Sequence, residues 1–258
     1  MKVGFLITAR LKSTRLPKKL LKKVNGASYM EWLIRRLKLS NRLDEIIICT
    51  STNPQDDPLI KIAKQENVEF FRGSEEDVIQ RLYDATKKFE LDYVINMTAD
   101  CPFIPFEMID LLLHSYRENN ADLIKCHDMA PGMFLSGLKI DAMKRVINLK
   151  GSDYSEYWLY YFLKTSIFDV RSLKIPSDLV RPDYRFILDY PEDHQFLKLV
   201  YEGLGPEAYK KESKEIIDLV DRNQGWLKIN AACQVKGIER TKQDETSKVI
   251  LRDGTIIN

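Results

Sequence analysis

The chain of 258 residues contains few cysteines and histidines, the residues that form disulfides and bind zinc, and it has no long hydrophobic run. Its four cysteines are scattered without a CxxC pair, which argues against a disulfide framework or a structural zinc site. Its three histidines show no HExxH spacing, which disfavours a catalytic zinc site. No apolar stretch approaches the roughly 20 residues that cross a bilayer, and the first residues lack the apolar core of a signal peptide. We therefore expect a cytoplasmic protein with no membrane partner.

Glycine-rich phosphate-binding turns are also missing. No G-x-G-x-x-G follows the first apolar run, which disfavours a dinucleotide-dependent dehydrogenase. The composition, with 44% hydrophobic residues, 30% charged residues and a net charge of +2, is ordinary for a globular protein. A chain of this length can hold one large α/β domain, alone or with an appendage. We expect no nucleic-acid partner.

Positive charge is concentrated at the beginning of the chain. Residues 1–42 contain twelve Lys or Arg and one acid, Glu31. An apolar run from Val3 to Ile7 leads into a loop that carries Arg10, Lys12, Ser13, Thr14, Arg15, Lys18 and Lys19. Guanidinium and ammonium groups are the usual partners of phosphate oxygens. The pattern favours a strand that delivers a triphosphate-binding loop to the edge of a sheet, although an ordinary solvated basic turn has the same composition.

Short β-rich runs alternate with amphipathic segments through the first half. We expect strands at Val3–Ala9, Glu45–Thr50, Val68–Phe71, Tyr93–Met97 and Asp122–Lys125. Helical spacing of apolar residues predicts helices at Tyr29–Leu39, Pro58–Glu66, Glu75–Phe89 and Phe106–Glu118. This alternation is typical of a Rossmann-like α/β fold, a mostly parallel sheet flanked by helices. Such sheets bind ligands at the carboxyl ends of their strands, where Arg10, Thr50 and Asp100 fall.

The second half is less regular. We expect a short strand within Gly132–Asp141, helices at Asp141–Asn148 and Tyr154–Lys164, strands at Ser172–Ile175 and Tyr184–Leu188, and a helix from Pro191. The pattern changes after Arg222, and Asp253-Gly254 between two apolar runs is a hairpin signal. We therefore predict a large domain over residues 1–222 and a small C-terminal appendage over residues 223–258, a β-hairpin or arm.

Two aspartates stand at the ends of predicted strands, Asp100 after Tyr93–Met97 and Asp189 after Tyr184–Leu188. A Mg²⁺ ion prefers one or two carboxylates together with phosphate oxygens and water. Each aspartate alone also fits a cap of the following helix, because a proline follows each of them closely. As a pair they also fit a metal site, whereas Asp193 is interpreted as an acid in the first turn of a helix.

Several segments together resemble the cytidylyltransferases that activate glycan precursors, the branch of the spore-coat polysaccharide and deoxy-octulosonate enzymes. Residues 9–19 read ARLKSTRLPKK, close to the family pattern A-R-x-x-S-T/S-R-L-P-G-K. Further matches follow in order: Thr50-Ser51-Thr52 with Asp56-Asp57, RGSEEDV at 72–78 with Arg81, TADCP at 98–102, and LDYPED at 188–193. The resemblance covers roughly residues 1–200. It implies the fold of the nucleotide-diphospho-sugar transferases, and it implies a homodimer.

The resemblance also implies roles for the matching residues. Arg10, Ser13, Arg15 and Lys19 stand where the family holds the triphosphate, with Arg15 and Lys19 nearest the departing pyrophosphate. Asp100 and Asp189 would bind Mg²⁺, and Arg15, Lys19 and Asp100 would carry catalysis. The chain departs from the pattern at Lys18, where the family usually has Gly. Either lysine could therefore reach the phosphate, and we favour Lys19.

Cytosine would be read by Arg81 and Thr98, which match positions near the base in the family, and by the backbone around Leu6–Ala9. Arg81 fits equally well on a solvated helix face, paired with Asp77 or Asp84 at helical spacing. For the acceptor, GLKID at 137–141 resembles a Gly-Leu-x-Val-Glu segment of the spore-coat branch, whereas the run at 155–158 lacks the Arg and His of that branch. Candidate acceptor residues are Lys139, Glu156, Tyr160, Arg181 and Arg185.

The resemblance implies a Mg²⁺-dependent cytidylyltransferase that transfers CMP from its substrate CTP to a small anionic acceptor, a sugar or polyol phosphate or a keto-sugar acid, for surface polysaccharide synthesis. One alternative is a nucleotide-sugar-dependent glycosyltransferase of related fold, which would use an Asp-x-Asp motif; Ala99-Asp100-Cys101 has one aspartate. A second alternative is a nucleotide-binding regulatory protein without turnover. Product formation from CTP would distinguish the three.

Overall fold

The computed structural model describes residues 1–152, 155, 158–245 and 249–257, and its central element is a seven-stranded sheet. The strand order is β5-β4-β1-β6-β8-β7-β9. The strands are β1 Val3–Thr8, β4 Glu45–Ser51, β5 Glu69–Gly73, β6 Tyr93–Thr98, β7 Leu123–Cys126, β8 Leu135–Lys139 and β9 Val170–Ser172. Strands β5, β4, β1 and β6 are parallel to one another, β8 runs antiparallel to both β6 and β7, and β9 is parallel to β7. The predicted α/β fold with a mostly parallel sheet is confirmed.

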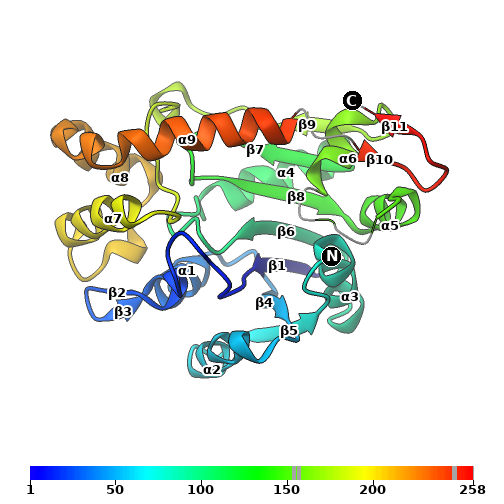
Figure 1. Cartoon of the computed structure of the whole chain (residues 1–258), viewed down its shortest axis with the longest axis horizontal. Helices are drawn as coiled ribbons and strands as arrows, with labels where there is room; N and C mark the ends of the chain where they lie inside the picture. Colours follow the sequence, from blue (N-terminus) through cyan, green and yellow to red (C-terminus); the bar gives the residue numbers. More distant parts are fainter. Residues whose placement is uncertain (153–154, 156–157, 246–248, 258) are drawn as a thin grey trace.

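Helices cover both faces of this sheet (Figure 1). They are α1 Tyr29–Leu37, α2 Asp57–Gln65, α3 Val78–Lys88, α4 Met108–Asn119, α5 Ile140–Leu149, α6 Leu159–Lys164, α7 Pro191–Leu204, α8 Ser213–Arg222 and α9 Leu227–Glu245. Strand β1 alternates between the two apolar cores: Phe5 and Ile7 pack with α1, α4 and α7, and Leu6 packs with α3 and α5. Because successive strand residues point to opposite faces, a strand covered on both sides is apolar throughout.

Two small antiparallel strand pairs complete the fold. Strands β2 Lys23–Val24 and β3 Ala27–Ser28 form a tight hairpin before α1, and β10 Val249–Ile250 pairs with β11 Ile256–Ile257. The second pair confirms the predicted hairpin, with Gly254 at φ 85° in its turn. None of the helices in the described part of the chain combines the length and apolar character that a bilayer crossing requires.

The predicted strand at Tyr184–Leu188 is wrong. This segment is an extended loop whose backbone bonds go to other loops, from Phe186 N to Pro131 O (2.7 Å) and from Leu188 N to Asp100 O (2.8 Å). Tyr184, Phe186 and Leu188 are buried, but no neighbouring strand in the described part of the chain pairs with this segment. Asp189 therefore lies just before α7 rather than at a strand end.

The C-terminal segment packs along the main fold. Figure 1 shows α9 running along the upper side of the molecule, from α8 to the β10–β11 pair. The hairpin joins the loop after α5: Gly151 N donates to Ile250 O at 2.9 Å, and Arg252 N donates to Leu149 O at 2.8 Å. The division at residue 222 stays a prediction.

Candidate functional site

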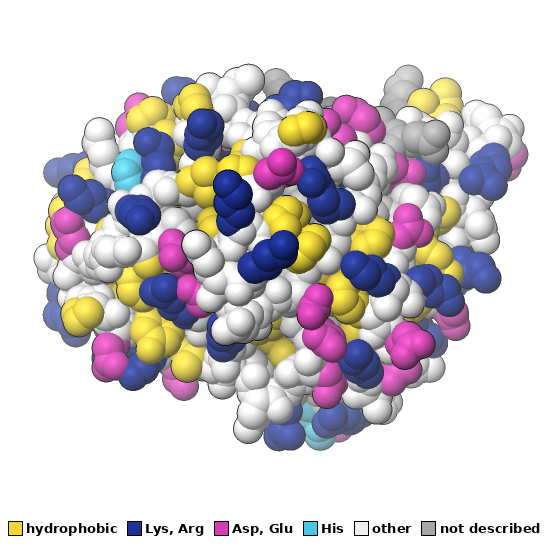
Figure 2. Space-filling view, turned by 90° about the horizontal axis from the view of Figure 1, so that it is seen from below, with side chains coloured by type: hydrophobic (Ala, Val, Ile, Leu, Met, Phe, Trp, Pro, Cys, Tyr) yellow, Lys and Arg dark blue, Asp and Glu magenta, His cyan; other side chains and the backbone are white. Residues whose placement is uncertain are grey.

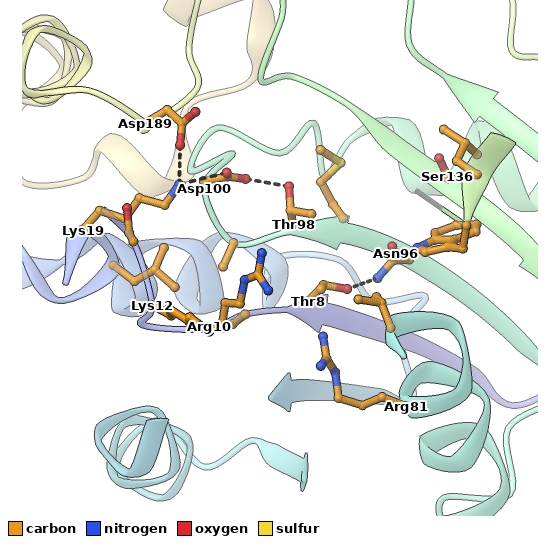
Figure 3. Close-up of a pocket in the computed structure, with 18 of the residues that line it drawn as sticks. Thr8, Arg10, Lys12, Lys19, Arg81, Asn96, Thr98, Asp100, Ser136 and Asp189 are labelled. Carbon is orange, nitrogen blue, oxygen red and sulfur yellow. Dashed lines mark hydrogen bonds and ion pairs between the residues drawn. The ribbon is translucent and has the colours of Figure 1, made fainter. Parts of the chain in front are cut away.

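A cavity of about 750 Å³ opens where the carboxyl ends of β1 and β6 lie side by side (Figure 3). Nine residues that the resemblance assigns to the nucleotide, the metal or catalysis line it: Ala9, Arg10, Ser13, Arg15, Lys19, Arg81, Thr98, Asp100 and Asp189. These residues come from positions 9 to 189 of the chain. The fold thus gathers all of them around one hollow, although contact with a ligand stays a prediction.

Asp56 holds the backbone of the loop after β1 through a hydrogen bond from Leu11. The Leu11 backbone N–H donates to Asp56 Oδ1 at 2.7 Å, and the Ser51 hydroxyl donates to the other carboxylate oxygen. Asp56 is fully buried and lies just before α2. A buried carboxylate that accepts a backbone N–H and a hydroxyl holds the loop backbone in one place. The backbone at the start of this basic loop is therefore held in a fixed position.

Lys18 and Lys19 point to different places. Lys18 has left-handed backbone angles, φ 52° and ψ 32°, and an exposed side chain. The chain thus keeps, without glycine, the positive φ that the family pattern suggests at this turn. Lys19 begins the short 3₁₀ turn Lys19–Leu21, and its side chain, 11% exposed, points into the cavity. Of the two lysines, Lys19 is the one that faces the site.

Two cations, Arg15 and Lys19, and two carboxylates meet at one end of the cavity, where Figure 3 shows Lys19 beside Asp100 and Asp189. Lys19 Nζ lies 3.0 Å from Asp100 Oδ2 and 2.8 Å from Asp189 Oδ1. Arg15 donates from its terminal nitrogen to Asp189 Oδ2 at 2.8 Å, and its guanidinium lies over the Tyr190 ring. Asp189 is 1% exposed. In this state the predicted phosphate ligands and the predicted metal ligands neutralise each other.

The ion pairs set the pKa values of these groups. Burial alone would raise the pKa of Asp100 and Asp189, but the charge of Lys19, aided at Asp189 by Arg15, holds both pKa values below their usual range. Burial likewise opposes charging of Lys19 and Arg15, and the carboxylates outweigh it and raise both pKa values. All four groups are therefore charged at neutral pH.

Neither aspartate is a helix cap. The N-cap of α4 is Glu107 and that of α7 is Tyr190. The second oxygen of Asp100 accepts from the Thr98 hydroxyl at 2.6 Å, which fixes the carboxylate toward the cavity. Asp193, as expected, is in the first turn of α7, and one of its oxygens accepts the backbone N–H of Asp189 at 3.0 Å. The capping alternative is therefore wrong for both residues.

The donor set fits a Mg²⁺ ion. Asp100 and Asp189 converge on one point where the Lys19 ammonium stands in for a bound cation. Within the described residues, no group of three or more Asp, Glu, His or Cys side chains could hold a metal. Two carboxylates suffice for Mg²⁺, because phosphate oxygens and water usually complete its coordination.

Arg81 lies beneath another part of the cavity and is not on a solvated helix face. It is 1% exposed, and its guanidinium donates to Ser74 O while its Nε has no hydrogen-bond partner. The alternative of pairing with Asp77 or Asp84 is wrong: Asp77 accepts from Lys150, and Asp84 accepts from Gln80. An unpaired, buried guanidinium N–H at a cavity wall is costly unless a ligand satisfies it.

The sequence did not identify the wall opposite the charged cluster. It includes Asn96 from β6, Ser136 from β8, His127 from the loop after β7, and Trp158 and Leu159 at the start of α6. His127 Nε2 lies 2.9 Å from Ser136 Oγ, and burial, helped by the charge of Lys125, lowers the pKa of His127 to about 4. In the sequence, the position of Asn96, a polar residue within an apolar strand, was the feature that could have pointed to this wall.

The acceptor candidates do not lie at this wall. Lys139, Tyr160, Arg181 and Arg185 are absent from the cavity lining, and Glu156 lies outside the described residues. Arg185 is buried in an ion pair with Asp193, and Arg181 pairs with Asp221. The guanidinium groups of Arg181 and Arg185 thus form ion pairs with carboxylates outside the cavity.

On the face shown in Figure 2, Lys and Arg side chains are interspersed with acidic and hydrophobic ones. They form no broad patch of one sign on that face. The four charged groups described above, by contrast, face one cavity.

Known proteins resemble the chain along most of its length. The model of a family described as Cytidylyltransferase matches residues 5–243. An uncharacterised protein of Methanocaldococcus jannaschii is 27% identical over 245 residues, which cover 94% of this chain and all of that protein. The spore coat polysaccharide biosynthesis protein SpsF of Bacillus subtilis is 28% identical over 227 residues, 85% of this chain and 94% of SpsF.

Solved structures also resemble the chain along most of its length. A cytidylyltransferase from Leptospira borgpetersenii superposes with a TM-score of 0.81 at 27% identity, over 88% of this chain and 97% of that chain. A CMP:2-keto-3-deoxy-manno-octonic acid synthetase complexed with CTP superposes with a TM-score of 0.59 at 15% identity, over 78% of this chain and 98% of the other. The second similarity concerns the fold alone.

Proposed function

The chain belongs to the cytidylyltransferase family, and from that premise we propose that it transfers CMP from CTP to a small anionic acceptor and releases pyrophosphate. The acceptor would be a sugar or polyol phosphate or a keto-sugar acid, and the product a precursor of a surface polysaccharide. One observation carries the proposal: Arg15, Lys19, Asp100 and Asp189 meet at one end of a cavity large enough for a nucleotide.

The reaction requires an acceptor oxygen to attack the α-phosphorus of CTP. A new bond forms between that oxygen and phosphorus, and the bond from the α-phosphorus to the bridging oxygen of pyrophosphate breaks. Negative charge grows on the departing pyrophosphate. Arg15 and Lys19 are placed to meet that charge, and such stabilisation is the main contribution of a protein to these transfers.

Asp100 and Asp189 are the residues that would hold Mg²⁺. When bound, the ion would neutralise phosphate charge and orient the triphosphate. The structure supports this assignment because the two carboxylates already converge on a cation, the Lys19 ammonium. Binding of the metal nucleotide then implies an exchange of partners, in which Lys19 and Arg15 leave the carboxylates for phosphate oxygens.

Arg81 is the residue that would read the cytosine edge. Its buried Nε has no hydrogen-bond partner among the described residues, and a pyrimidine carbonyl or ring nitrogen can accept that hydrogen bond. Thr98 and the backbone of Ala9 line the same cavity and would supply further contacts.

The proposal is tested by a pyrophosphate-release assay with Mg²⁺ and each of the four nucleoside triphosphates. Acceptors from both classes are supplied, for example glycerol 3-phosphate, glucose 1-phosphate and 3-deoxy-manno-octulosonate, and the product mass is determined. We expect release that depends on CTP and on one acceptor class. Calorimetric titration that shows equal or tighter binding of a purine triphosphate would refute the assignment. Light scattering tests the expected homodimer.

A further inference from the structure

The backbone that carries Asp189 is fixed by Asp193. The backbone N–H groups of Asp189 and Tyr190 both donate to Asp193 Oδ2 at 3.0 Å. Asp193 is fully buried and forms a two-pronged ion pair with Arg185, at 2.9 Å from Nε to Oδ1 and 3.2 Å from the terminal nitrogen to Oδ2. The direction of the Asp189 carboxylate therefore depends on where Asp193 is held.

A residue of the C-terminal helix holds this pair. Asn230, 2% exposed, donates from Nδ2 to Asp193 Oδ1 at 3.1 Å and to Arg185 O at 3.0 Å. Its backbone breaks the helical geometry of α9, with φ −117° and ψ 16°. Both hydrogen bonds reach the 185–193 loop from an element outside it. A buried ion pair is stable only when its remaining hydrogen-bonding capacity is satisfied, and Asn230 contributes to that.

The next turns of α9 cover the same loop. A Cβ atom at Gly237 would lie 2.8 Å from a terminal nitrogen of Arg185, so only glycine fits there without displacing the guanidinium. Lys236 Nζ lies over the Tyr190 ring, 5.4 Å from its centroid. The hydrogen-bond network from Asn230 through Asp193 ends at Asp189, and Asp189 lines the cavity.

We propose that Asn230 is a positioning residue of the active site: through Asp193 it holds the Asp189 carboxylate in the direction needed for the metal nucleotide. The inference rests on the proposed function, since it takes Asp189 as a ligand of the metal. It assigns a role to the C-terminal helix, whose described side chains supply none of the cavity lining. Partners that orient a ligating carboxylate typically change metal affinity by 10- to 100-fold when they are removed.

The test compares Asn230→Ala with Asn223→Ala in the full chain. Asn223 is a matched control because its Nδ2 donates to one backbone carbonyl, Leu219 O at 2.8 Å, and no hydrogen bond found among the described residues joins it to the 185–193 loop. Mn²⁺ affinity is measured with saturating CTP by electron paramagnetic resonance of the free ion. We expect the Kd for Mn²⁺ to rise about 10-fold in Asn230→Ala and to stay unchanged in Asn223→Ala.

Gly237→Ala gives a second route, because it leaves Asn230 in place and acts on Arg185. Alanine in a helix interior ordinarily stabilises the helix, so weaker Mn²⁺ binding in a protein of equal or higher unfolding temperature would support positioning. Wild-type Mn²⁺ affinity in both Asn230→Ala and Gly237→Ala, or equal losses in Asn223→Ala, would overturn the inference. A wild-type protein that binds neither CTP nor Mn²⁺ would overturn the proposed function first, which separates the two failures.

Discussion

Lys19 and Asp189, 170 residues apart in the sequence, are joined by a 2.8 Å ion pair inside the cavity. The same ammonium also reaches Asp100, so one side chain bridges the two carboxylates that would bind the metal. Lys19 thus lies where the proposed divalent cation would be held. Its role as counter-ion of the two carboxylates and its proposed role as a phosphate ligand can be separated experimentally.

Lys19→Met removes the ammonium but keeps much of the side-chain length. Two carboxylates are then left facing each other without their shared cation, so we expect a lower unfolding temperature in the absence of divalent ions and its recovery on addition of Mg²⁺. Turnover should fall about 100-fold or more, because pyrophosphate loses a stabilising charge. Thermal unfolding with EDTA and with Mg²⁺ is the measurement. Lys18→Met, on the exposed side of the turn, is the control, and comparable damage there would show that the wrong lysine was chosen.

Substitution of Asp100 and of Asp189 by asparagine should reduce turnover in both cases but should lower the unfolding free energy by different amounts. Asp189 is 1% exposed and paired with Arg15 and Lys19, so Asp189→Asn should cost about 3 kcal/mol of unfolding free energy. The Asp100 side chain is 26% exposed, and Asp100→Asn should cost about 1 kcal/mol or less. Both should lose most of their turnover. Urea unfolding and the pyrophosphate assay provide the two readouts, and an Asp100→Asn enzyme that stays active at saturating Mg²⁺ would remove Asp100 from the metal site.

Arg81→Gln should weaken base discrimination. The guanidinium is buried under the cavity away from the charged cluster, so its loss should raise the Kd of CTP while the affinity for pyrophosphate stays the same. A single polar contact is worth about 1–3 kcal/mol, which corresponds to roughly 5- to 150-fold in the ratio of CTP to UTP affinity. Calorimetric titration of CTP, UTP and pyrophosphate gives this ratio. An equal loss for all three ligands would indicate a purely structural role for Arg81.

His127 should make folding sensitive to mild acid. Its pKa is lowered to about 4 in the folded protein, against about 6.5 in the unfolded chain, because burial disfavours the charged ring. Below pH 6.5 the unfolded chain therefore binds the proton more readily, and stability falls as the pH is lowered toward 4. Between pH 7.5 and 4.5 the wild type should lose about 2 kcal/mol more than His127→Gln. Parallel pH profiles from urea unfolding would contradict this expectation.

Lys18→Gly should stabilise the protein without changing turnover. A residue other than glycine pays about 1–2 kcal/mol for left-handed backbone angles, and glycine returns part of this through its greater freedom in the unfolded chain. We expect a net gain of about 0.5–1 kcal/mol, measured by urea unfolding. Lys18→Ala keeps the backbone strain and should show no gain. A loss of turnover in Lys18→Gly would place the Lys18 side chain at the phosphate after all.

Local sequence patterns sufficed for most of the elements. The strands around Phe5, Ile48 and Ile95 are apolar because helices cover both faces of the sheet, and that pattern is visible without a structure. The segment around Phe186 is equally apolar, yet it forms no strand, because a strand needs a hydrogen-bonding neighbour that local sequence does not show. The antiparallel direction of β8 is likewise decided by pairing with β6 and β7.

The site was predictable where it follows the family pattern. Arg15, Lys19, Asp100 and Asp189 were named from their register, and the fold brings them together. Their ion pairs could not be foreseen, because they join segments up to 174 residues apart. His127 lies in a loop without any motif, and Asn230 lies in a helix that the resemblance does not cover. Their positions follow from packing between distant elements.

The order in which the chain is synthesised bears on the role of the C-terminal hairpin. Among the described residues, those that line the cavity all lie at or before Asp189, so a ribosome that has released residues 1–222 has already delivered this lining. The loop that follows α5 still lacks its partner, since Gly151 bonds to Ile250 and Leu149 bonds to Arg252. The wall formed by Trp158 and Leu159 follows this loop directly. We therefore expect the nascent protein to collapse around its sheet early and to fix the loop after α5 only when residues 249–257 have emerged.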